Sequence, residues 1–486
     1  MAPKGNSSDE LAYALITPYS LHKSRTGGII ARLLWANVHL AAARMYAPSR
    51  EGDFIERYCD AIYDPQEEHI PLRYQRMLIQ YVAENFGRPN ARGISNRMMV
   101  LVFQGPNAQQ DIAEAVGHIG RDVRGDDVRG TFGDFVSPEW GESWREEAQE
   151  RARKALSRYP ALQKIELPER RSSFFEPGAL TGVTPEMTRQ HLELFQETAY
   201  SDGGFVLGAL EKLDTEDVET SMVILKPESF RRRNPLPGNL VDFFARTGMY
   251  ITGTKIMQLD AERARQFYES KLEQFRGQLK DMVADEARDI LRKARDLAGS
   301  LDRSFDLASP PEISDLIALT RQADYLCNPP EEKGPGEVKP RVSERIYCLL
   351  QERLDDMDPS EEFFEELAEE LKDLNAQAEF DELIRYMSGA DAEDGAGAEG
   401  QAGTLCMALL YSGKDAVRVI RQRLRKLRDV YGQNILQNRA HASDPEEDPI
   451  REMEVLGMPS APSGEKRPCD LERLVNDFYG RGSSAE

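Results

Sequence analysis

The stretch LAYALITPYS, residues 11–20, decides how this chain can be organised, because a similar stretch, TSMVILKPES, occupies residues 220–229. Each is an apolar run that ends near a proline. Such runs predict buried strands, and proline ends a strand because it has no N–H to donate to the sheet. A strand that recurs with the same ending indicates an internal repeat of the segment around it.

The segments that follow each of these strands recur in the same order. After the first strand, the apolar pattern predicts a helix, two strands and a second helix, over residues 27–35, 38–48, 97–105 and 107–117. After the second strand, the same succession is predicted over residues 237–247, 249–259, 404–413 and 414–428. We therefore predict the α/β class in the form of an α+β sandwich, with two ferredoxin-like βαββαβ domains and antiparallel sheets.

The repeats set the predicted domain boundaries. We expect a first domain over residues 9–150, a partly helical connection over 151–217, and a second domain over 218–480. A mainly helical insertion at about 277–378 interrupts the second domain. A mobile loop rich in glycine, alanine and acids is predicted at 388–403.

The composition of the chain argues against nucleic acids and membranes as binding partners. The chain has 486 residues and a formal net charge of −22, which argues against general affinity for nucleic acid or anionic membranes. No apolar run reaches the roughly 18 residues of a membrane-spanning helix, and the first residues lack the apolar core of a signal peptide. The five cysteines include no Cys-x-x-Cys pair, so neither a zinc site nor a disulfide framework is indicated. We expect a cytoplasmic protein with no nucleic-acid or membrane partner.

The stretch NRAHASDPEEDPIREMEVLG, residues 438–457, places one of the chain's six histidines ahead of a run of acids. A neutral imidazole can act as a nucleophile and take up a phosphoryl group. It needs a partner that fixes its tautomer, and Glu452 on the following predicted helix could reach back to His441. A purely structural role is the alternative for a lone histidine.

A basic stripe precedes this histidine. Four arginines share one face of the helix predicted to end at residue 428: Arg418, Arg421, Arg425 and Arg428. Guanidinium groups bind phosphate oxygens with two parallel hydrogen bonds, so the stripe could hold a polyphosphate. Lys226, at the end of its strand, could add a point charge. The alternative is an exposed basic surface that only pairs with acids of the insertion.

The segment around His441 resembles the active-site signature of the nucleoside diphosphate kinase family. In that family an asparagine precedes the catalytic histidine by three residues, a small residue and Ser-Asp follow it, and an acidic helix ends in a glutamate that supports the imidazole. Here these positions hold Asn438, His441, Ala442, Ser443, Asp444 and Glu452. The family usually has glycine in place of Ala442.

Other segments are similar to family segments at matching places along the chain. ILKPES, ARQFYES and FDELIRYMSG resemble segments with a phosphate-contacting lysine, the active-site tyrosine and a phenylalanine that stacks on the base, here Lys226, Tyr268 and Phe380. Two phosphate-binding arginines of the family match Arg421 and Arg428. Arg428 precedes the histidine by 441 − 428 = 13 residues, the spacing that the family keeps.

The resemblance implies a nucleoside diphosphate kinase that moves the γ-phosphoryl group of a nucleoside triphosphate to a nucleoside diphosphate through a phosphohistidine. It implies these catalytic residues: His441, Glu452, Lys226 and Tyr268. It implies these nucleotide-binding residues: Lys226, Phe380, Arg421, Arg428, Asn438 and Ser443. The implied cofactor is Mg2+, carried on the nucleotide phosphates rather than in a metal site of the protein.

Two departures from the family pattern bear on binding. Only six residues separate Arg421 from Arg428, so the loop that carries a phosphate-contacting threonine in the family is absent. The helical insertion lies where the family's nucleotide-gripping helices meet the third strand. These departures leave a second hypothesis, a catalytically weak or inactive nucleotide-binding sensor or scaffold on the same fold. RNA binding is disfavoured by the net charge and by the absence of an aromatic RNA-binding pattern.

The first repeat resembles the same family with its chemistry removed. Its counterparts of Lys226, Tyr268 and Arg421 are Thr17, Tyr58 and Ala113. Arg129 is the candidate for the second arginine, and no histidine follows it, because VSPEWGESW, residues 136–144, occupies the expected place. We expect one active and one inactive repeat, paired as a pseudo-dimer within the chain, with further homo-oligomers left open.

Overall fold

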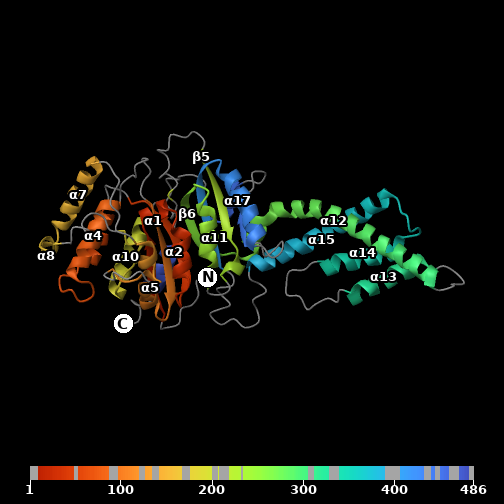
Figure 1. Cartoon of the computed structure of the whole chain (residues 1–486), viewed down its shortest axis with the longest axis horizontal. Coiled ribbons are helices and arrows are strands. Elements are labelled where there is room, and N and C mark those ends of the chain that lie inside the picture. The colour runs from red at the N-terminus through yellow and green to blue at the C-terminus, as the bar shows by residue number, and fades with distance from the viewer. Residues whose placement is uncertain are drawn as a thin grey trace. The chain divides into compact units, whose positions relative to one another are not determined.

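The chain folds into two compact units in the computed structural model (Figure 1). The structure describes residues 9–48, 53–86, 97–119, 126–133, 142–166, 176–199, 206, 218–230, 234–304, 311–327, 339–388, 405–431, 439–443, 449–458 and 470–480. The sheet unit comprises Met1–Leu259, Ala392–Gln433 and Asn438–Glu486, and the helical unit comprises Asp260–Asp391 and Asn434–Gln437. Across these described ranges, no helix is both long enough and apolar enough to cross a membrane.

The first sheet of the sheet unit has four antiparallel strands in the order β2-β3-β1-β4. They are β1 (Glu10–Ile16), β2 (His39–Tyr46), β3 (Met98–Gly105) and β4 (Ala179–Leu180). The helices between them are α1 (Pro18–His22), α2 (Thr26–Leu33), α3 (Phe54–Ile62), α4 (Leu72–Asn85), α5 (Ala108–Val116), α6 (Val128–Phe132), α7 (Glu142–Leu156) and α8 (Pro160–Gln163). Thr17 alone separates the end of β1 from Pro18, in agreement with the predicted apolar run that ends near a proline.

The second sheet has the equivalent order, β6-β7-β5-β8, and is also antiparallel. Its strands are β5 (Val218–Leu225), β6 (Tyr250–Gln258), β7 (Leu405–Lys414) and β8 (Ala440–Ala442). The 3-10 helix η2 (Pro227–Ser229) and the helices α11 (Leu236–Ala245), α17 (Ala416–Tyr431) and α18 (Pro449–Val455) accompany them. The predicted α+β class with two antiparallel sheets is confirmed.

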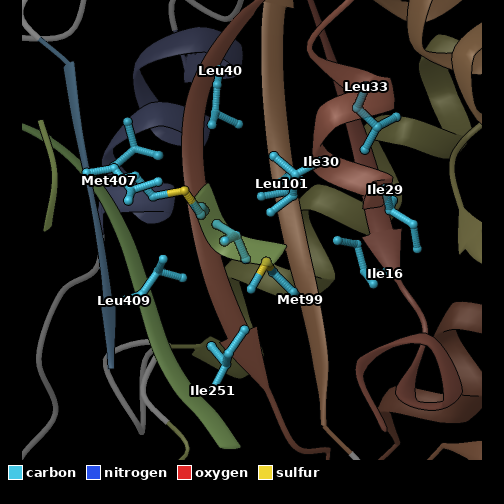
Figure 2. Packing of buried hydrophobic residues seen from close by; sticks show 14 of the residues in the cluster. Ile16, Ile29, Ile30, Leu33, Leu40, Met99, Leu101, Ile251, Met407 and Leu409 are labelled. Atoms are coloured by element: carbon cyan, nitrogen blue, oxygen red, sulfur yellow. The ribbon is translucent and has the colours of Figure 1, made fainter. Parts of the chain in front are cut away.

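One hydrophobic core joins the two repeats. Ile16 of β1 and Leu225 of β5 belong to the same buried cluster. Figure 2 shows residues of the first repeat, among them Ile30 and Leu101, in this cluster together with Met407 of the second. A fully buried aliphatic side chain contributes about 1.5–3 kcal/mol relative to an exposed one, so the shared core makes the two repeats depend on each other.

The repeats also touch through a pair of glycines where α2 and α11 cross. A Cβ on Gly27 would lie 2.5 Å from the carbonyl oxygen of Gly238 and 2.3 Å from the amide nitrogen of Asp242. A Cβ on Gly238 would lie 2.4 Å from the carbonyl oxygen of Gly27 and 2.2 Å from the amide nitrogen of Ala31. Gly27 therefore contacts Gly238 and the residue four positions after Gly238, and Gly238 contacts Gly27 and the residue four positions after Gly27. This reciprocity is the pattern of a contact related by two-fold symmetry.

The helical unit contains α12 (Ala261–Ser304), α13 (Ile313–Cys327), α14 (Lys339–Arg353) and α15 (Glu361–Ser388). Ion pairs fix α12 and α15 as antiparallel neighbours: Arg265–Asp381 at 3.0 Å, Arg276–Asp373 at 2.9 Å, Lys280–Glu369 at 3.3 Å and Arg288–Glu361 at 2.6 Å. The predicted limits of the insertion, 277 and 378, both fall inside these two helices. The unit begins at Asp260 because α12 is one uninterrupted helix that no sequence break divides.

Two other boundaries differ from the prediction. Residues 151–217 were expected to be only a connection, yet they supply β4 and α10 (Pro185–Ala199) to the first repeat. The segment up to 480 was assigned to the second repeat, yet Leu471 of α19 (Asp470–Tyr479) packs in a cluster with Tyr13 and Phe195 of the first. Both segments cover apolar faces that the first repeat alone leaves exposed. Most of the predicted loop 388–403 lies outside the described residues.

Candidate active site

β8 brings His441 to the edge of the second sheet. The strand pairs with β5 so that Ala440, His441 and Ala442 oppose Leu225, Ile224 and Val223. Ala440 and Ala442 lie in the hydrophobic core together with Leu225 and Val223. Because successive side chains of a strand point to opposite faces, His441 lies on the other face of the sheet, with Ile224.

Glu452 fixes the tautomer of this histidine. It is buried on α18, and its Oε1 accepts a hydrogen bond from His441 Nε2 over 3.0 Å. Since a carboxylate can only accept, Nε2 carries the proton and the lone pair of the neutral imidazole lies on Nδ1. The predicted support of His441 by Glu452 therefore has the geometry that a nucleophilic Nδ1 requires.

Two arginines of α17 bracket the histidine. Arg421 Nη1 donates to the carbonyl oxygen of Ala442 over 3.4 Å, and Arg428 Nη2 donates to that of Ala440 over 3.3 Å. Both arginines stand on one continuous helix, as their six-residue separation predicts. The predicted stripe is not uniform, because the exposed Arg418 instead pairs with Asp415 at 3.0 Å.

Lys226 continues β5 in an extended conformation, with φ −76° and ψ 161°. By strand alternation its side chain starts on the same face as Ile224 and His441. Its backbone N–H donates to the carbonyl of Arg439 over 2.9 Å, next to β8. The described contacts therefore place Arg421, Arg428 and Glu452 around β8 and the backbone of Lys226 beside it.

Ser443 has a role in the backbone pairing of this site. Its hydroxyl oxygen accepts the N–H of Met222 over 3.4 Å, and its own N–H donates to the Met222 carbonyl over 3.0 Å. Ser443 is completely buried. It therefore anchors the end of β8 in this structure, and its contact with nucleotide stays a prediction.

Three predicted site residues are not part of this cluster as described. Asn438 lies outside the described residues. Tyr268 stands on α12 and Phe380 on α15, so both belong to the helical unit. Within that unit the Tyr268 ring meets the ring of Phe267 edge-to-face at 4.7 Å between centroids. Their proposed contacts with nucleotide remain predictions.

The residues around His441 are nearly inaccessible to solvent. The exposed fraction is 3% for His441, 3% for Lys226 and 1% for Glu452. The imidazole and its two charged neighbours are therefore almost fully enclosed in this structure.

Sequence reasoning missed three residues that hold the site in place. Glu228 Oε1 accepts the N–H of Arg439 over 2.8 Å, and Arg439 has a left-handed φ of +70°. Lys255 of β6 donates to the carbonyl of Leu456 over 2.9 Å, at the end of α18. Glu228 could have been noticed because it follows Lys226 and Pro227. An arginine in the sequence, by contrast, gives no sign of a left-handed backbone conformation.

The first repeat places a leucine where the second has its histidine. Leu180 of β4 pairs with Leu15, and His441 pairs with Ile224. These two pairs are equivalent, because Leu15 lies two residues before Thr17 and Ile224 lies two residues before Lys226, the counterpart of Thr17. The expected place at 136–144 was wrong, because α7 and α8 intervene before the last strand forms. Leu180 belongs to an apolar cluster, so this repeat has no nucleophile at that position.

Arg129 reproduces one contact of Arg428. Its Nη2 donates to the carbonyl of Ala179 over 3.4 Å, the residue before Leu180, as Arg428 donates to the residue before His441. Burial lowers the pKa of Arg129 to about 10. The first repeat therefore keeps an arginine of the site without the histidine that it would serve.

A buried carboxylate occupies the first repeat beside Thr17, the counterpart of Lys226. Glu176 Oε1 accepts from the Thr17 hydroxyl over 2.6 Å and from Gly178 N–H over 2.8 Å, and Oε2 accepts from the Tyr81 hydroxyl over 2.9 Å. Burial raises the pKa of Glu176 to about 7 despite these donors. A negative or neutral acid here, in place of a lysine, opposes phosphate binding by this repeat.

Glu176 should make the stability of the sheet unit depend on pH. Because its folded pKa of about 7 lies above the ordinary 4.5, the stabilisation of its protonated form is complete below pH 4.5 and is lost as pH rises through 7. Relative to Glu176→Gln, the wild type should lose roughly 2 kcal/mol between pH 5 and pH 7. Urea unfolding followed by tryptophan fluorescence measures this difference, since Trp35, Trp140 and Trp144 all lie in the first repeat. A difference between the two proteins that does not change with pH would contradict this assignment.

Comparisons with known proteins identify no family for this chain. No protein-family model matches the chain, and no curated protein matches it. Among the described residues, no three histidine, cysteine, aspartate or glutamate side chains gather as metal ligands. What the chain does must therefore be inferred from the side chains around His441.

Proposed function

We propose that this protein is a nucleoside diphosphate kinase that works by a ping-pong mechanism through a phosphohistidine on His441. The observation that carries the proposal is the hydrogen bond from His441 Nε2 to the buried Glu452, with Arg421 and Arg428 bound on either side of the histidine. The two guanidinium groups donate to the backbone carbonyls of the residues on either side of the histidine, which places two cations beside the strand that carries it.

The residues have complementary roles in the proposed reaction. Nδ1 of His441 attacks the γ-phosphorus in line, the new N–P bond forms, and the bond to the bridging oxygen breaks, so that the diphosphate leaves with the electron pair. Glu452 keeps the proton on Nε2 and stabilises the positive imidazole of the phosphohistidine. Arg421, Arg428 and Lys226 offset the charge of the phosphate oxygens, because such transfers depend mainly on positioning and electrostatics. A second diphosphate then reverses the steps.

The cation set at this site fits a magnesium ion carried by the nucleotide rather than by the protein. Lys226, Arg421 and Arg428 are basic, and the carboxylates of Glu452 and Glu228 already accept hydrogen bonds from His441 and Arg439. Bound to the phosphates, Mg2+ would supply further charge neutralisation.

The arrangement of the sheet unit supports the same proposal. Both sheets have the strand order expected of ferredoxin-like βαββαβ domains, and the reciprocal contact of Gly27 with Gly238 fits a pseudo-dimer within one chain. The proposed pseudo-dimer has one active repeat, since Leu180 replaces the histidine in the other.

A nucleotide-binding scaffold without catalysis is the second candidate. The observation that favours it is the unbroken helix α17, which carries Arg421 and Arg428 without the phosphate-contacting loop found between them in the family that the segment resembles. The tautomer-fixing bond from Glu452 favours the enzyme, because binding alone does not require a defined lone pair on Nδ1.

Arg428→Ala should weaken binding of nucleoside triphosphate at least tenfold, because it removes a phosphate-binding guanidinium next to His441. Arg129→Ala, its counterpart in the first repeat, should change the affinity less than about twofold, since no phosphate binds there. Isothermal titration with a non-hydrolysable triphosphate measures both. Equal weakening by the two variants would mean that the first repeat also binds nucleotide.

The test of the proposed activity is transfer between two nucleotides. Purified protein with Mg2+, a nucleoside triphosphate and a different nucleoside diphosphate should form the second triphosphate. Initial rates at several fixed donor concentrations should give parallel double-reciprocal lines, the pattern of a covalent intermediate. Nucleotide binding without any transfer would favour the scaffold, and intersecting lines would exclude the phosphohistidine route.

A further inference from the structure

The residue before the histidine strand is held from a distant segment of the sheet unit. Arg439 N–H donates to Glu228 Oε1 over 2.8 Å, and the Arg439 carbonyl accepts the N–H of Lys226 over 2.9 Å. Glu228 lies in η2, directly after Lys226 and Pro227, and only 8% of it is exposed. One short segment therefore binds both backbone groups of the residue that leads into β8.

Arg439 needs such contacts because its backbone is strained. Its φ of +70° lies in the left-handed region, which a residue with a Cβ adopts only at a cost in free energy. Such a conformation persists when surrounding groups hold it. Arg439 Nε adds a hydrogen bond to the carbonyl of Tyr431 over 3.0 Å, but the amide N–H depends on Glu228 for the contact that fixes the turn.

The register of β8 is sensitive to this turn. β8 has three residues and lies at the edge of the sheet, so it pairs with β5 alone. A slip of one position would exchange its two faces. His441 would then point into the core that Ala440 and Ala442 now fill, away from Glu452.

The first repeat provides the same hydrogen bond by another route. Gly178 occupies the position of Arg439, has φ +74°, and donates its N–H to Glu176 Oε1 over 2.8 Å. Tyr19 stands where the second repeat has Glu228, so the carboxylate comes from before the strand instead. Two different carboxylates on equivalent amides indicate that this bond is a requirement of the turn.

We propose that Glu228 is a positioning residue for phosphoryl transfer: by binding the Arg439 amide, it holds β8 in the register that presents the His441 imidazole to Glu452. This role rests on the proposed kinase activity. Glu228 acts through the backbone, so it controls the rate of attack by His441 and leaves nucleotide affinity unchanged. What it supplies is an oxygen acceptor at a fixed reach, which glutamine can also supply.

Three substitutions separate reach from charge. Glu228→Gln keeps the acceptor and the reach, Glu228→Asp keeps the charge but is one methylene shorter, and Glu228→Ala removes both. The first readout is hydrogen–deuterium exchange of peptides that cover residues 439–443. Loss of a backbone hydrogen bond should speed exchange there at least about tenfold in the Ala and Asp variants, with the Gln variant close to wild type.

The second readout is single-turnover labelling of His441 by γ-labelled ATP at saturating concentration, with the ATP Kd measured in parallel. A displaced nucleophile should slow labelling by roughly ten- to a hundredfold in the Ala and Asp variants, with Kd within about twofold of wild type. The Gln variant should stay within about threefold. Glu176→Gln in the first repeat is the matched control and should leave labelling unchanged.

Results that differ from these expectations would contradict either the positioning role of Glu228 or the kinase proposal. If Gln fails as badly as Ala while Asp retains activity, charge rather than positioning is the function of Glu228. If Kd rises and the labelling rate does not fall, Glu228 serves nucleotide binding. If wild-type protein takes up no label, the kinase proposal fails, whereas exchange at residues 439–443 still shows whether Glu228 holds β8. Unchanged exchange in both Ala and Asp variants would overturn the positioning role.

Discussion

His441→Asn should abolish phosphoryl transfer, with at least about a thousandfold loss in kcat, because an amide nitrogen has no lone pair available for attack on phosphorus. The substitution leaves the sheet pairing of β8 with β5 intact, since that pairing uses backbone groups. Transfer between two nucleotides, measured at saturating substrate, gives the comparison. His69→Asn is the control, since the exposed side chain of His69 lies in the same unit and should not affect the rate.

Residual transfer would contradict the assignment of the nucleophile. Circular dichroism should show that the His441→Asn protein remains folded. A second variant, Glu452→Gln, tests the same site while keeping the histidine: the amide can still accept from Nε2 but cannot offset an imidazolium charge. We expect it to lower kcat by roughly a hundredfold, and wild-type activity in this variant would remove Glu452 from the mechanism.

Gly238→Ala should destabilise the sheet unit severely. Alanine is favoured over glycine within a helix by about 1 kcal/mol, so propensity alone predicts a gain in stability for this position in α11. The added Cβ would meet backbone atoms of Ala31 and Gly27 at 2.2 and 2.4 Å, which no side-chain rotation can relieve. The helices must separate, and overpacking of this kind costs typically 1–3 kcal/mol, occasionally more. We expect a net loss and a melting transition lower by several degrees.

Gly277→Ala is the matched control for this substitution. Gly277 lies within α12, and no atom lies within 4 Å of the position that its Cβ would take. Propensity therefore acts alone, and the variant should be as stable as wild type or slightly more stable. Scanning calorimetry of both proteins gives the comparison. Stabilisation by Gly238→Ala would show that α2 and α11 do not cross at these glycines.

The sequence predicts the strands of this protein well, for a physical reason. The apolar runs around residues 11–20 and 220–229 become β1 and β5, inner strands of their sheets, and a strand covered on both faces is recognised by such a continuous apolar run. Because the segment is repeated, the same succession of strands and helices could be predicted independently from each half of the chain. The order of the strands in both sheets depends on pairing between strands far apart along the chain, and only the structure shows it.

Short elements and long helices escaped the same reasoning. β4 has two residues, too few for any pattern, and it forms because Leu15 and Ile16 offer a free edge to Leu180 and Ala179. The prediction placed a boundary at about residue 277, whereas α12 runs without interruption from Ala261 to Ser304. Hydrogen bonding within a helix continues past a domain boundary when the residues on both sides are good helix formers.

At the candidate active site, the sequence was a better guide to which residues lie near β8 than to what each of them contacts. Arg421, Arg428 and Glu452 contact β8 from two helices, while the roles predicted for them in nucleotide binding and catalysis stay predictions. Ser443 shows the limit, since a serine suited to phosphate also suits the N–H of Met222. The left-handed turn at Arg439 depends on a carboxylate 211 residues earlier in the chain, which no local pattern contains.

The central claim is that His441 becomes phosphorylated. Full-length protein should be incubated with γ-labelled ATP and Mg2+, quenched in base, separated from nucleotide and digested for mass spectrometry. Our account predicts a label that is stable to base and labile to acid, that approaches one per chain, that maps to His441, and that a nucleoside diphosphate removes. Protein that carries no label, or a label elsewhere, would contradict the account.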